Sequence, residues 1–115
     1  MGLFDSVSYV AVGSALDALA LRQRAIADNV ANLQTPGYRA RVVDFEQALS
    51  RAVATGSGDA SAAVSRSLAA TREDGNNVDL DEQTLLNVET NLRYQLATQA
   101  ASGQFSSVRA AMRTS

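Results

Sequence analysis

The sequence contains no cysteine and no histidine. A chain without cysteine forms neither disulfides nor thiolate metal sites, and a chain without either residue lacks the commonest nucleophiles, general bases and metal ligands. The carboxylates are scattered rather than paired in an apolar segment, and no phrase containing glycine matches a phosphate-binding loop. The sequence therefore predicts a protein that is not an enzyme and that binds no cofactor, metal ion or small-molecule substrate.

The sequence also lacks a large excess of either charge and lacks long apolar runs. Lysine and arginine number 10 against 12 acidic residues, which gives a net charge of −2, so no basic field is present to hold a nucleic acid. No apolar run approaches the roughly 20 residues needed to span a bilayer. The first ten residues, MGLFDSVSYV, lack a basic segment followed by an apolar one, so no cleavable signal peptide is visible. If the protein works outside the cytoplasm, another export route must carry it.

Aromatic residues make up only 5% of the chain, although 46% of the chain is hydrophobic. Much of the hydrophobic fraction is alanine, which packs closely and buries little area. Such a composition is typical of helix-on-helix packing and argues against a large self-sufficient core in a chain of 115 residues. We expect the isolated chain to be only marginally folded and to gain most of its order on assembly.

Apolar residues with helical spacing fill the first part of the chain. The pattern predicts a helix from residue 5 or 6 to about residue 33, roughly 42 Å long at 1.5 Å per residue. Its apolar residues form a heptad seam in which Gln23 is the single polar member. Arg22, Arg24 and Asp28 lie off this seam and are expected to be solvated or to meet another subunit. The seam residues predicted to pack on partner helices are Val12, Leu16, Leu19, Ile26, Val30 and Leu33.

Proline and glycine stop this helix at one place. Pro36 lacks a backbone N–H and pushes Thr35 out of the helical region, and Gly37 can adopt the positive φ that a type II turn needs. Asn29 and Asn32, in the last helical turn, are placed to bond backbone groups as the helical hydrogen bonds run out. The chain should therefore leave the helix in a fixed direction.

The middle of the chain is polar and rich in small residues. Residues 42–54 predict a short helix with three apolar residues on one face, which are Phe45, Leu49 and Val53. Residues 55–71 have the composition of a linker and are expected to be flexible in the free subunit, with only Val64 and Leu68 as possible anchors.

A turn cluster at residues 74–77 precedes the last predicted helix, Leu80 to about Met112. Asp79 is the expected N-cap, and Glu82 stands at the third helical position of a capping-box variant. The acidic segment lacks the glycine and the glutamate that an EF-hand loop needs at its sixth and twelfth positions, which excludes a calcium loop.

The last helix changes its apolar side halfway along. A helix packed only on its own hairpin partner should show one continuous stripe, so two opposed stripes predict two neighbours, one within the chain and one from another subunit. Slight bending or a sequence stutter gives the same drift. The first stripe consists of Leu85, Val88, Leu92 and Leu96. The second consists of Tyr94, Ala97, Ala101, Phe105, Val108 and Met112.

These elements predict an all-α fold in which two long helices pack as an antiparallel, coiled-coil-like hairpin with a partly disordered middle. We divide the chain into an N-terminal axial helix (1–34), a turn, short helix and flexible linker (35–78), and a C-terminal axial helix (79–115). A two-helix unit leaves apolar surface in water, so association with copies or partners is expected.

Two segments of the sequence carry a more specific pattern of residues than a helix end and a turn require. They are NVANLQTPGYRARVVDFEQAL, entered from the first helix, and DGNNVDLDEQ, which precedes a helix containing NLRYQL. Together they resemble the axial family that builds the rod, hook and filament of the bacterial flagellum. The continuation through VDFEQAL and the small middle region are most similar to members from the proximal rod. The motif residues are Asn29, Asn32, Thr35, Pro36, Gly37, Tyr38, Asn76, Asn77 and Asp79.

The resemblance implies a structural subunit of the flagellar basal body, located in the periplasmic rod. Such a subunit passes unfolded through the flagellar type III export apparatus, without a cleavable signal peptide, and assembles by helix packing near the membrane ring. The implied partners are further rod subunits, including copies of itself and the rod protein FlgC, together with the adaptor FliE, the basal-body ring and the export gate. The short middle, rich in alanine and serine, departs from the family pattern.

A cytosolic helical binding module, such as an adaptor or an export chaperone, is the alternative from another functional class. That alternative predicts a stable soluble dimer retained in the cytoplasm. The rod interpretation predicts that recovery in purified basal bodies depends on secretion, and that motility is lost without the gene. A different rod protein of the same family is a third interpretation.

Overall fold

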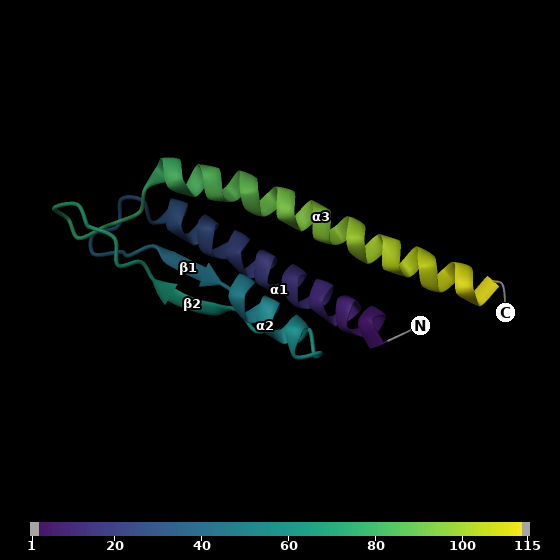
Figure 1. Cartoon of the computed structure of the whole chain (residues 1–115). Helices are drawn as coiled ribbons and strands as arrows, with labels where there is room; N and C mark the ends of the chain where they lie inside the picture. Colours follow the sequence, from purple (N-terminus) through teal and green to yellow (C-terminus); the bar gives the residue numbers. More distant parts are fainter. Residues whose placement is uncertain (1–2, 114–115) are drawn as a thin grey trace.

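The computed structural model describes residues 3–113, and the side chains of residues 6–104 and 106–113. In chain order the elements are α1 (Leu3–Ala31), β1 (Arg41–Asp44), α2 (Glu46–Ala54), β2 (Ala63–Arg66) and α3 (Leu80–Arg113). The two long helices lie side by side and run in opposite directions, which confirms the predicted mostly helical hairpin (Figure 1). The molecule is slender, with extents of 65 × 25 × 15 Å.

The turn after α1 has the geometry that its proline and glycine predict. Gly37 has φ of 75°, and the N–H of Tyr38 donates to the carbonyl of Thr35 at 3.2 Å, closing the turn around Pro36 and Gly37. A side chain at Gly37 would meet no atom within 4 Å, so the positive φ, rather than crowding, favours glycine here. The turn directs the chain back along α1.

The expected short helix begins later than the sequence predicts. Residues 42–44, assigned to this helix in the sequence analysis, belong instead to β1, and α2 starts at Glu46. β1 pairs with β2 in an antiparallel sheet of two strands, with Val43 opposite Val64. Part of the segment predicted as a linker is therefore strand β2. The reason is tertiary, because the backbone of β1 also bonds side chains of α1, as described below.

The N-cap predicted for α3 is confirmed. The Asp79 carboxylate accepts the N–H of Asp81 at 3.0 Å and that of Glu82 at 3.3 Å, which satisfies two of the N–H groups that a helix start leaves free. Acidic residues in this first turn also favour the positive end of the helix dipole.

The core of the hairpin is small. Its centre is a cluster of Ala18, Leu19 and Phe45, against which side chains from α1, α2 and α3 pack, among them Leu49, Tyr94 and Ala97. Phe45, just before α2, and Leu49 within it thus face the core, as predicted, whereas Val53 is 46% exposed and Ala52 is buried in its place. No described helix is long and apolar enough to cross a membrane.

Candidate assembly site

Three buried asparagines join the two halves of the chain at the closed end of the hairpin. We call Asn29, Asn76 and Asn77 the asparagine cluster. Asn29 and Asn76 are fully buried and Asn77 nearly so. Each side chain bonds backbone groups of a segment far away in the sequence, so the cluster fixes how the turn after α1 meets the loop before α3.

Asn29 connects α1 to both β1 and α3. Its Oδ1 accepts the N–H of Arg41 at 2.8 Å and its Nδ2 donates to the carbonyl of Arg41 at 3.0 Å. Nδ2 also donates to Oε1 of Gln83 at 3.1 Å, and the Tyr38 hydroxyl donates to Oδ1 at 3.2 Å. An amide offers both donors and acceptors, so one side chain can satisfy all four partners without water.

Asn76 and Asn77 act from the other side. Asn76 Nδ2 donates to the carbonyls of Asn32 and Thr35, at 2.8 and 2.9 Å, so each of these oxygens accepts a second bond beside the backbone N–H that it already accepts. Asn77 Oδ1 accepts the N–H of Ala40 at 2.7 Å. The two glycine turns also touch, since a Cβ on Gly75 would lie 3.3 Å from the Cα of Gly37.

The predicted motif residues therefore come together in space. Asn32 and Thr35 also bond each other, through the Thr35 hydroxyl and Asn32 Oδ1 at 3.0 Å, and Pro36 is exposed at the tip. Arg72 completes the junction by donating to the carbonyls of Leu33 and Val78, at 2.6 and 2.7 Å. Neither Arg72 nor Gln83 was predicted from the sequence as a member of this junction.

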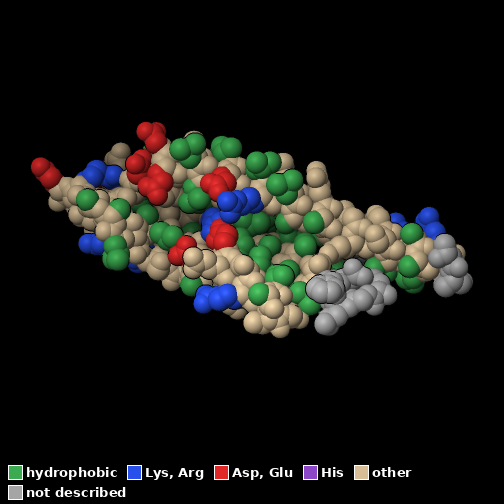
Figure 2. Space-filling model, in the orientation of Figure 1, with side chains coloured by type: hydrophobic (Ala, Val, Ile, Leu, Met, Phe, Trp, Pro, Cys, Tyr) green, Lys and Arg blue, Asp and Glu red, His purple; other side chains and the backbone are tan. Residues whose placement is uncertain are grey.

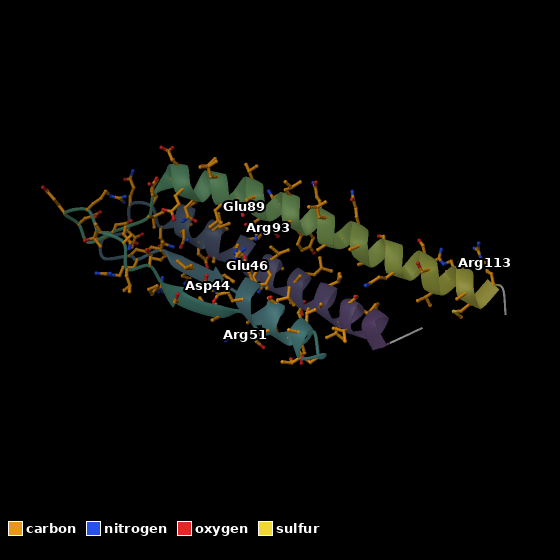
Figure 3. The ribbon with its side chains drawn as sticks, viewed as in Figure 1. Asp44, Glu46, Arg51, Glu89, Arg93 and Arg113 are labelled. Carbon is orange, nitrogen blue, oxygen red and sulfur yellow. The ribbon has the colours of Figure 1, made fainter. Side chains whose placement is uncertain are left out.

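A second polar group crosses the middle of the hairpin. Arg22 of α1 lies 2.6 Å from the Glu46 carboxylate of α2, donates to the carbonyl of Val43 at 3.2 Å, and stacks over the ring of Phe45 at 4.8 Å. Glu46 also pairs with Arg93 of α3 at 3.2 Å, and Arg93 pairs with Glu89 at 2.6 Å (Figure 3). The prediction that Arg22 is solvated is wrong, because its side chain is buried by these contacts.

This group lowers the pKa of Glu46. Burial alone would raise the pKa, but the hydrogen bond from Arg22, further bonds from the backbone N–H groups of Glu46 and Phe45, and the charge of Arg22 outweigh it and lower the pKa to about 2. The carboxylate is therefore ionised throughout the physiological pH range. Through its ion pairs with Arg22 and Arg93, it links α2 to α1 and α3.

The seam predicted on α1 is covered to different degrees by the chain itself. Leu19 and Ile26 are buried, Val12, Leu16 and Leu33 are half-buried, and Val30 is 42% exposed. Gln23, the polar member, meets α3 through a bond from its Nε2 to Asn91 Oδ1 at 2.8 Å.

The two stripes of α3 have different surroundings. Tyr94 and Ala97, of the second stripe, pack on the core, and Ala101 and Val108 are half-buried. The Phe105 side chain lies outside the described residues, and Met112 is 73% exposed. Towards the start of α3 the buried positions are polar, namely Gln83 and Thr90. Gln83, Thr90 and Ala97 follow one another at intervals of seven residues, a heptad signal that is visible in the sequence.

The first stripe of α3 lies in the open. Leu85, Val88, Leu92 and Leu96 are between 56% and 73% exposed. Figure 2 shows hydrophobic side chains spaced along the outer side of α3, away from α1. Among the described residues there is no group of carboxylates arranged to hold a metal ion. The exposed stripe of α3 is a helix surface suited to packing against another protein.

Comparisons with known proteins identify relatives of this chain. Residues 9–39 match the family model described as "Flagella basal body rod protein". The chain is 32% identical to the flagellar basal body rod protein FlgB of Escherichia coli, over 78% of this chain and 81% of that protein. It is 29% identical to the FlgB of Borrelia hermsii, over 81% and 86% of the two chains, and 26% identical to that of Bacillus subtilis, over 84% and 85%. With this identity and coverage, the chain belongs to the FlgB family of flagellar basal body rod proteins.

Proposed function

We propose that this chain is a structural subunit of the proximal rod and that it assembles through the helix faces that its own hairpin leaves uncovered. The observation that carries the proposal is the exposed row of Leu85, Val88, Leu92 and Leu96 on α3, which we call the leucine row. Burying a valine or leucine side chain contributes roughly 1.5–3 kcal/mol, so covering four of them in a subunit contact supplies a substantial driving force. The rod family is structural and not enzymatic, in line with the missing histidine and cysteine.

The composition and the small core of the chain support type III export as the route that we propose to the rod. A type III apparatus threads its substrates in an unfolded state, and a chain without cysteine has no disulfide to reduce before it is threaded. The small core of a single helical hairpin opens at low cost and can re-form after export. The partners that we propose in the rod are copies of this chain, FlgC, the adaptor FliE, the basal-body ring and the export gate.

The test is Leu92→Asp, expressed from the natural locus as the only copy of the gene. The charge would lie unpaired in the subunit contact, so we expect loss of swimming and absence of the chain from purified basal bodies. Asn87→Asp is the matched control, because it adds the same charge at an exposed position of α3 outside the leucine row. Circular dichroism of both purified variants should show the helix content of the natural chain.

Normal incorporation of the Leu92→Asp chain would contradict assembly through this row. A natural chain that stays in the cytoplasm as a stable dimer, and is absent from basal bodies, would contradict the rod function itself. That second result would favour the adaptor or chaperone alternative.

A further inference from the structure

The two edges of the small sheet are not equivalent. On the outer edge of β1, the backbone N–H and carbonyl of Arg41 bond Asn29, and the carbonyl of Val43 accepts from Arg22. Side chains of α1 therefore close this edge as a neighbouring strand would. The other long edge of the sheet belongs to β2, which forms the outer layer of the molecule in Figure 1.

The register shows which groups of β2 are unpaired. Opposed residues in an antiparallel pair alternate between those that exchange hydrogen bonds and those that do not. Because Arg41 and Val43 direct their backbone groups to α1, the exchanging pairs are Val42 with Ser65 and Asp44 with Ala63. The backbone N–H and carbonyl groups of Val64 and Arg66 therefore point away from β1, along the free edge.

Among residues 3–113, no loop, bulge or proline covers this edge, and its short strand of four residues carries one charged side chain, Arg66. Natural proteins cover free edges with loops, bulges, proline or inward-pointing charges, because a free edge accepts further strands. All four residues of β2 are exposed, and none is proline. Val64 is 51% exposed, and Leu68, just beyond the strand, is 92% exposed. An open edge beside two uncovered aliphatic side chains has the features of a strand-addition site.

The positive charge at this edge favours a binding partner that carries negative charge. Arg66 donates to the carbonyl of Arg39 at 2.9 Å and lies over the ring of Tyr38 at 5.2 Å, but neither arginine has a carboxylate partner among the described residues. A second copy of β2 on this edge would bring its own arginines towards Arg66 and Arg39, and like charges repel. A strand that carries carboxylates would neutralise them instead.

We propose that β2 is a docking edge for an extended, acidic segment of a different protein. The segment would add as a third strand beside β2, bond the backbone of Val64 and Arg66, cover Val64 and Leu68 with alternate apolar side chains, and place a carboxylate against Arg66 and Arg39. This site goes beyond the proposed rod contact, because it uses the middle of the chain and neither long helix.

A synthetic peptide on the full-length chain tests this site. The probe has seven residues, with valine alternating with threonine between two terminal glutamates, and a counterpart carries lysines at both ends. We expect the acidic peptide to slow amide hydrogen exchange at Val64 and Arg66 at least tenfold and to leave Ser65, which is already bonded to β1, unchanged. We also expect it to bind at least tenfold more tightly than the lysine peptide, with Arg66→Glu reversing that preference.

Val64→Pro provides a second variant that retains the β1–β2 pairing, because proline is tolerated where the N–H faces outward from an edge strand. Unchanged exchange at Ser65 shows that the sheet is intact, and peptide binding should be lost. Equal binding of both peptides, or no slowing at Val64 and Arg66, would overturn the proposal. An alternative outcome is that the two amides exchange slowly without any peptide, and only at concentrations at which the chain forms dimers. That result would overturn the proposed occupant and show that a second copy of the chain binds this edge. None of these results depends on whether the chain reaches the basal body.

Discussion

At the scale of single residues, amide side chains rather than apolar ones hold the closed end of the hairpin. Asn29 satisfies a strand edge, a tyrosine hydroxyl and a glutamine from one fully buried position. Asn76 does the same for the carbonyls at the end of α1. Buried polar groups with every bond made specify one arrangement, because any shift leaves groups unpaired.

Asn29→Leu should therefore cost far more stability than its change in volume implies. It leaves the part-buried backbone groups of Arg41 and the buried amide of Gln83 without the Asn29 partner, and we expect a loss of about 3 kcal/mol in the free energy of unfolding. Urea denaturation followed by circular dichroism measures this loss. Asn87→Leu, at an exposed position of α3, should change the free energy by less than about 0.5 kcal/mol. Similar losses in the two variants would show that Asn29 does not have this role.

The sequence indicated part of this arrangement. The phrases around Thr35-Pro36-Gly37 and Asn76-Asn77 marked turns, and Asn29 was expected to bond backbone near the helix end. The partners of Asn29 could not be predicted, because Arg41 and Gln83 are brought to it only by the fold. Arg22 was misplaced for the same reason: nothing in its local sequence reveals that Glu46 and Phe45 will meet it.

At the scale of elements, α1 and α3 were predictable because each carries a helical period over about thirty residues and a recognisable end. β1 and β2 were not, because strands of four residues show too little period to be distinguished from a helix or a linker. The position of β1 depends on side chains of α1 that lie 12 to 21 residues away in the sequence, and β2 is placed by pairing with β1.

Glu46 should give the packing of these elements a measurable pH dependence. Its pKa is lowered in the folded chain from 4.5 to about 2, so its contribution is fully present above pH 4.5 and is lost as the pH falls towards 2. The side chain is 44% exposed, and after allowance for solvent screening we expect the contribution to be about 1 kcal/mol. Urea denaturation between pH 7 and pH 2.5 measures it.

Glu46→Gln should remove that part of the pH dependence, whereas Glu82→Gln should leave it in place, because Glu82 has no ion pair among the described residues. If the natural chain and the Glu46→Gln variant lose stability in parallel below pH 4.5, then the ion pairs of Glu46 with Arg22 and Arg93 do not stabilise the fold.

At the scale of the whole molecule, the shape is that of a part rather than of a self-contained domain. The radius of gyration is 17.7 Å, against about 13 Å for a compact domain of this length. The accessible surface is 7695 Å², whereas a compact monomer of 12.1 kDa exposes about 6,000 Å². This excess is consistent with the expectation that the isolated chain is marginally folded, which remains a prediction.

Stability should therefore depend on the concentration of the chain. If copies bind each other through the leucine row of α3 only when folded, association stabilises the fold by mass action, and the thermal midpoint rises with protein concentration. A variant carrying Leu85→Ser and Leu92→Ser should unfold at a midpoint that does not change with concentration, because both side chains are exposed in the single subunit and their loss affects the contact rather than the core. Calorimetry over a hundredfold range of concentration, with sedimentation to give the association state, compares the two chains. A cooperative, high-melting transition of the natural chain while it is still monomeric would show that the hairpin needs no neighbour, and the leucine row would then require another explanation.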